Sequence, residues 1–128
     1  MDPFSDEVLG IKIQIAFFFE KIQQYKKATE ILEVIKRDCL KWIDMFGSQP
    51  GMEGRRTKLL AKTVGVSVKL GELYSSDYVL ENESAEENLV WAVTTAIKEQ
   101  QRRKEEGVKP DEGDWLSSDE IGGSMEGT

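Results

Sequence analysis

Apolar side chains recur every three or four positions along most of this chain, which is the spacing that places them on one face of an α-helix. The clearest row lies in residues 25–46 and consists of Tyr25, Ala28, Leu32, Ile35, Cys39, Trp42 and Phe46. The opposite face carries charged side chains that we expect to lie in water: Lys26, Lys27, Glu30, Glu33, Lys36 and Arg37. The turn residues of segment 47–51, Gly-Ser-Gln-Pro-Gly, predict the end of this helix.

Segment 5–22 predicts a helix with two apolar rows instead of one. Ser5 is the expected N-cap, and the acidic residues 6 and 7 suit the positive end of the helix dipole. The first row comprises Val8, Ile11, Ile15, Phe18, Phe19 and Ile22, and the second comprises Leu9, Ile13, Ala16 and Phe17. We therefore expect neighbours to cover this helix on more than one face.

Two longer helices are predicted over residues 54–76 and 84–106. Val64, Val66 and Val68 alternate in the first, so a strand competes locally, but the flanking leucines favour a helix. Ser84 with Glu87 three residues later forms a capping-box pattern for the second.

The C-terminal part of the chain is predicted from the pattern of helix 84–106 and the residues after it. The apolar seam of helix 84–106 is Ala85, Leu89, Ala92 and Ala96, with Val93 and Ile97 alongside. Residues 98–106 contain no apolar side chain, so this end, including Arg102, Arg103 and Lys104, is expected to project into water. Residues 107–116 predict a loop, and Ser118 to Ile121 predict the start of another helix.

Composition narrows the class of protein. The chain has 128 residues, about one domain, and a net charge of −7, which argues against general nucleic-acid binding. It has no histidine and one cysteine, Cys39, so the usual general base, an internal disulfide and a thiolate zinc site are absent. Cys39 lies within an apolar seam and is expected to be a buried, inert thiol. We expect a protein that is not an enzyme and holds no cofactor or metal.

The helices alternate in kind, which suggests repeated pairs. The first helix of each pair carries Ile15, Ala16 and Phe19, or Leu70, Gly71 and Tyr74, at the same steps. The second carries Ala28, Leu32 and Ile35, or Ala85, Leu89 and Ala92. This arrangement resembles the tetratricopeptide repeat (TPR), a helix–turn–helix unit. The resemblance implies an all-α, TPR-like α-solenoid of antiparallel helix pairs: a tail at 1–4, two degenerate pairs at 5–46 and 54–106, and a truncated third repeat at 107–128.

Three stretches resemble a narrower group, the fungal adapter subunits of the mitochondrial inner-membrane i-AAA protease complex. They are SDEVLGIKIQIA from residue 5 with its continuation EKIQQYKKATEILEVI from residue 20, VGVSVKLGELYSS from residue 64 and ENLVWAVTTAIKEQQRRKEEG from residue 87. This resemblance implies a domain on the intermembrane-space side of the mitochondrial inner membrane, tethered by a membrane segment outside this sequence. It also implies that the partners are subunits of the protease complex and unfolded substrate segments.

In a TPR solenoid the first helix of each pair lines the concave surface. Placing this sequence on the repeat puts seven residues there: Ile13, Phe17, Glu20, Lys21, Val68, Glu72 and Ser75. Such a surface suits extended apolar segments. Alternatively, Phe17 and Phe18 pack against a neighbouring repeat or a second copy of the chain.

Two functional hypotheses follow from this surface. One is a non-enzymatic adapter that captures unfolded segments, and the other is a structural scaffold that docks through its charged outer surface. An uncapped solenoid end also exposes apolar surface, so we predict a homodimer or domain swap through residues 107–128 or the face of Phe17 and Phe18.

Overall fold

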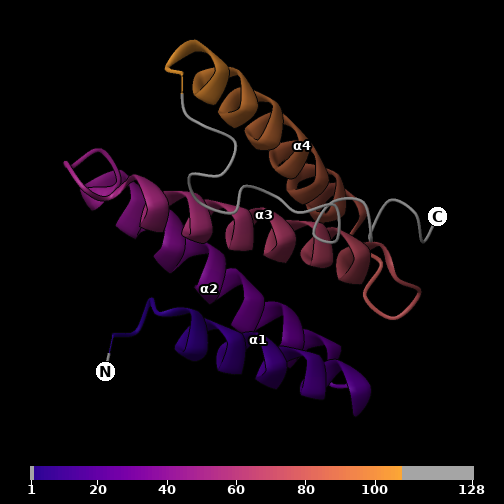
Figure 1. Cartoon of the computed structure of the whole chain (residues 1–128). Coiled ribbons are helices and arrows are strands. Elements are labelled where there is room, and N and C mark those ends of the chain that lie inside the picture. Colours follow the sequence, from indigo (N-terminus) through magenta and orange to yellow (C-terminus); the bar gives the residue numbers. More distant parts are fainter. Residues whose placement is uncertain (1, 108–128) are drawn as a thin grey trace.

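The computed structural model describes residues 2–107, and they form an all-α fold of four helices with no strand among them (Figure 1). The helices are α1 (Asp6–Lys21), α2 (Tyr25–Phe46), α3 (Glu53–Ser75) and α4 (Asn82–Glu105). Each helix begins and ends within two residues of its predicted bounds. Residues 64–68 lie inside α3, so the alternative of a strand there is wrong. The predicted helix start at Ser118 lies outside the described residues.

Each helix packs on the one before it in the chain, so that α1 and α4 occupy opposite edges of the array (Figure 1). The main core forms where α1, α2 and α3 meet. Its buried members are Leu9, Ala16, Ala28, Leu32, Ile35, Cys39, Leu59, Val66, Leu70 and Leu73. The apolar seam predicted on α2 is thus confirmed through its middle, and the expected burial of Cys39 is confirmed as well. None of the four helices combines the length and apolar character that a bilayer crossing requires.

Only one of the two apolar rows of α1 is covered. The row containing Leu9 and Ala16 enters the core, whereas Ile11, Ile15, Phe18 and Ile22 of the other row stay exposed. The expectation that both faces would be covered is therefore wrong within residues 2–107. The reason is topological, because α1 is the edge helix and only α2 packs closely on it.

The start of α4 corrects a predicted cap. The helix begins at Asn82 with Glu81 as N-cap, so Ser84 lies inside the first turn and caps nothing. Ser5 does cap α1, because its hydroxyl accepts a hydrogen bond from the Val8 amide at 3.3 Å.

The two serines give a matched pair for testing helix caps. We expect Ser5→Ala to lower the free energy of unfolding by about 1 kcal/mol, because the Val8 amide loses its acceptor. Ser84→Ala should change it by less than about 0.5 kcal/mol, since alanine suits a helix interior. Urea unfolding followed by circular dichroism measures both, and equal losses would contradict these assignments.

The charged end of α4 projects into water only in part: most of residues 98–106 are exposed as predicted, but two side chains are buried. Glu99 is only 3% exposed, and Arg103 is also buried. Both guanidinium nitrogens of Arg56 donate to Glu99, at 2.8 and 2.9 Å, and Arg102 donates to it as well. Arg103 donates to the Thr57 hydroxyl at 3.0 Å. Paired charges thus replace apolar side chains where the C-terminal half of α4 meets the start of α3.

The charged face of α2 is also less solvated than predicted. Lys36 donates to the Ser67 hydroxyl at 3.1 Å and to the Asn88 side-chain oxygen at 2.9 Å, and its ammonium lies 4.4 Å from the centroid of a Trp91 ring. Burial lowers the Lys36 pKa, although nearby carboxylates oppose the shift. Glu33 accepts a hydrogen bond from the Tyr74 hydroxyl at 2.9 Å. These side chains are long enough to reach α3 and α4 from the margin of α2.

Candidate protein-binding groove

A small apolar hollow lies between α1 and α3, with α2 beneath it. Its volume is about 110 Å³, enough for one medium-sized side chain but not for a cofactor. We call it the α1/α3 groove, and it is lined by Ile13, Phe17, Leu32, Lys62, Gly65, Val66 and Lys69. Leu32 is fully buried and Phe17 is 37% exposed, so the groove runs from the core to the surface.

Lys69 joins the two sides of the α1/α3 groove. Its ammonium lies 2.9 Å from the Glu20 carboxylate on α1 and 3.8 Å from Glu72 on its own helix. It also lies 5.3 Å from the centroid of the Phe17 ring, within range of a cation–π interaction. These contacts hold the Phe17 ring at the outer edge of the groove. Phe17 is partly exposed there, so the groove is open to solvent on that side.

Gly65 and Lys62 shape the α3 side of the groove. A Cβ atom built on Gly65 would meet no atom within 4 Å, so this position leaves open space beside Val66. Lys62, one turn before Gly65, is partly buried and forms no ion pair with any residue of the described part of the chain. The groove therefore offers an apolar floor with an uncompensated positive charge at its rim.

The structure brings together four of the seven residues that the sequence assigned to a concave surface. Ile13 and Phe17 line the groove, and Glu20 and Glu72 reach it through Lys69. The other three, Lys21, Val68 and Ser75, do not line it. The Ser75 hydroxyl instead donates to the Glu72 backbone carbonyl at 3.1 Å.

Sequence reasoning missed most of the α3 side of the groove. Lys62, Gly65 and Lys69 recur at steps of three and four, so they occupy one face of α3. A glycine between two lysines on a single helical face was the available signal. The repeat register points to Val68 and Ser75 instead, because it fixes the rotation of the helix from the family pattern.

The α1/α3 groove is lined by apolar side chains and two lysines, and the single cysteine of the chain lies away from it. Cys39 is fully buried, and burial raises its pKa, so its thiol stays protonated and unreactive at neutral pH. Within residues 2–107, no acidic and thiol side chains converge in a group that could hold a metal ion.

Comparisons with protein-family models, with curated proteins and with solved structures give no match to this chain. The function is therefore argued from the geometry of the helices and the groove.

Proposed function

We propose that this chain is a non-enzymatic adapter that binds extended protein segments by seating one apolar side chain in the α1/α3 groove. The observation that carries this proposal is the accessible hollow lined by Ile13, Phe17 and Val66 over buried Leu32. Its volume suits a leucine or phenylalanine side chain, and the Lys62 ammonium at the rim favours acidic residues on either side of that anchor.

The helix arrangement supports a TPR-like stack of pairs as the framework for this groove. Within residues 2–107, close backbone packing runs from each helix to the next, as in solenoids, where each unit packs on its neighbours. Gly71 also allows Leu89 to approach the α3 backbone, which is the close packing of small and large residues that the repeat pattern implied.

The cellular setting is a separate part of the proposal. By its resemblance to adapter subunits, the chain would present unfolded substrates to the AAA protease of the mitochondrial inner membrane, on its intermembrane-space side. Co-purification of the tagged chain with the protease subunits from solubilised inner membranes tests this part. Its absence from that complex would refute the mitochondrial setting and leave the groove itself unaffected.

Two neighbouring phenylalanines provide the test of the groove. We expect Phe17→Ala to weaken binding of a fluorescent decapeptide, with one central phenylalanine and acidic flanks, by about fivefold, or ~1 kcal/mol. Phe18→Ala should leave binding unchanged, because Phe18 lies outside the groove. Fluorescence anisotropy measures both affinities.

Ile13→Ala should reproduce the loss seen with Phe17→Ala. Unchanged affinity in both groove variants would rule the groove out. If charge reversal at Lys26, Lys27 and Arg37 then abolished partner binding, the scaffold hypothesis would be favoured, since all three side chains are exposed on α2.

A further inference from the structure

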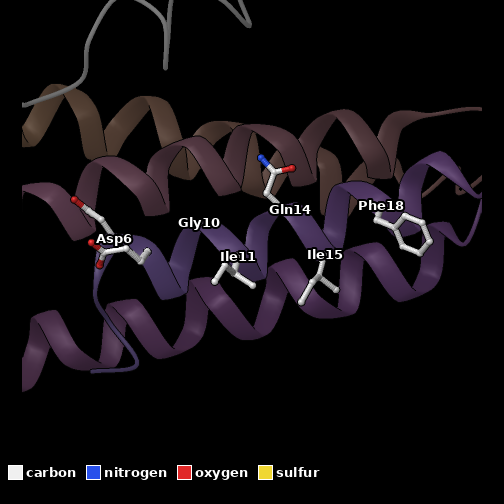
Figure 2. A pocket seen from close by; sticks show the side chains of 7 residues that line it. Asp6, Gly10, Ile11, Gln14, Ile15 and Phe18 are labelled. Carbon is white, nitrogen blue, oxygen red and sulfur yellow. The ribbon is translucent and has the colours of Figure 1, made fainter. Parts of the chain in front are cut away.

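The outer face of α1 carries a continuous apolar stripe that no residue of the described chain covers. The stripe consists of Ile11, Ile15, Phe18 and Ile22, of which Ile11 is 60% and Phe18 56% exposed. Figure 2 shows Ile11, Ile15 and Phe18 projecting from successive turns of α1. A stripe of this kind on one helix is typical of a surface that packs on another protein.

A shallow hollow runs along the stripe. Its volume is about 470 Å³, and it is lined by Asp6, Glu7, Gly10, Ile11, Gln14, Ile15 and Phe18 (Figure 2). At Gly10 no side chain fills it, and a Cβ atom built there would meet nothing within 4 Å. The Phe18 ring lines the same hollow two turns further along the helix.

The charges at the two ends of α1 are opposite. Glu7 is exposed in the first turn and Lys21 is exposed in the last, and neither forms an ion pair within residues 2–107. They lie 14 positions apart, or about 21 Å along the helix. Two such helices placed side by side in opposite directions would bring each glutamate next to the other helix's lysine.

We infer that the outer face of α1 binds a second copy of this chain, with the two α1 helices antiparallel about a two-fold axis near Gln14. In this register the Phe18 ring of each copy enters the hole formed by Glu7, Gly10, Ile11 and Gln14 of the other, as a knob enters a hole in a coiled coil. Glu7 of each copy then lies opposite Lys21 of the other, so one register satisfies both shape and charge. The contact is independent of the α1/α3 groove, which lies on another side of α1.

The stripe is small for a dimer interface. One helical face from each copy buries about 1,000 Å² in total, below the standard range for stable interfaces. Interfaces of this size are typical of weak association, so we expect a reversible equilibrium between monomer and dimer. Because the contact is two-fold, it closes at two copies.

The exposed apolar side chains of α4 offer a competing mode of assembly. Val90, Val93 and Ile97 lie on α4, at the opposite edge of the array. Packing α1 of one copy on α4 of the next would be head-to-tail and would continue into open chains instead of closing. The mass of the assembly distinguishes the two modes.

Charge exchange between the helix ends tests the inference. Sedimentation equilibrium between 10 μM and 1 mM should show the wild type moving from monomer to dimer and no further. Glu7→Lys and Lys21→Glu should each weaken self-association at least tenfold, because like charges then meet at both ends. An equimolar mixture of the two variants should dimerise as strongly as the wild type, since each pair is again opposite in charge.

Gly10→Leu provides a variant that fills the hole without disturbing the folded monomer. It should weaken the dimer at least tenfold while its thermal melting stays at or above that of the wild type, because leucine favours a helix more than glycine does. Phe17→Ala should leave the dimer intact. A monomer at 1 mM, a mixture that fails to dimerise, or assemblies larger than two copies would each overturn the inference.

Discussion

Glu99→Gln is expected to lower the free energy of unfolding by about 3 kcal/mol, the range found when one partner of a buried ion pair is removed. Glu99 is almost fully buried and accepts hydrogen bonds from both Arg56 and Arg102. Glutamine keeps the shape of the side chain but removes the negative charge that compensates these guanidinium groups. Urea unfolding at pH 7 measures the loss.

The same carboxylate predicts how the effect depends on pH. Burial alone would raise the Glu99 pKa, but hydrogen bonds from Arg56 and Arg102 outweigh it and hold the pKa below its ordinary value of 4.5. The unfolded state therefore binds this proton at a higher pH than the folded state, so the stabilisation is full above pH 4.5 and is lost on further acidification.

The difference between wild type and Glu99→Gln should accordingly shrink as the pH falls below 4.5. Glu86→Gln, an exposed change on the same helix, is the control and should cost less than about 0.5 kcal/mol. Equal losses in the two variants would show that the charged end of α4 is solvated after all.

Gly71→Val is expected to destabilise the chain by about 2 kcal/mol through overpacking between α3 and α4. A Cβ atom built on Gly71 would lie 2.5 Å from Cγ and 2.6 Å from Cδ2 of Leu89, so either the Leu89 side chain leaves its place or one of the helices shifts. Gly65→Val on the same helix is the control, because a Cβ atom built at position 65 meets no atom within 4 Å. It should cost less than about 0.5 kcal/mol.

A double-mutant cycle isolates this contact. Leu89→Ala should recover at least 1 kcal/mol in the Gly71→Val background, although it costs stability on its own. Urea unfolding of the four proteins gives the coupling free energy. A coupling near zero would mean that Gly71 does not hold α3 and α4 close together.

The fold was predictable where apolar periodicity decides it. On α2 the apolar row predicted the buried residues correctly. A helix with a single apolar row is stable only when that row faces the core. On α4 the pattern was right for Ala85 and Ala92, which are buried. It was wrong for Val93 and Ile97, which are exposed, and for Glu99, which is buried. Glu99 is buried against its partner Arg56, which lies on α3, 43 positions earlier in the chain. Spacing along one helix carries no information about such a partner.

The candidate site was predictable on one of its two sides. Ile13 and Phe17 were placed on the binding surface, and both line the α1/α3 groove. The α3 residues were not, because the rotation of α3 about its axis depends on packing against α2 and α4 together. That rotation turns Lys62, Gly65 and Lys69 toward α1 and leaves Val68 out of the groove.

Methyl-resolved nuclear magnetic resonance tests binding in the groove most directly. Titrating the phenylalanine decapeptide into protein with labelled isoleucine, leucine and valine methyls reports each side chain separately. We predict that the methyl signals of Ile13, Leu32 and Val66 shift together, whereas those of Ile11 and Ile97 do not. Shifts confined to Ile11 or Ile97, or no shifts at saturating peptide, would contradict the α1/α3 groove as the binding site.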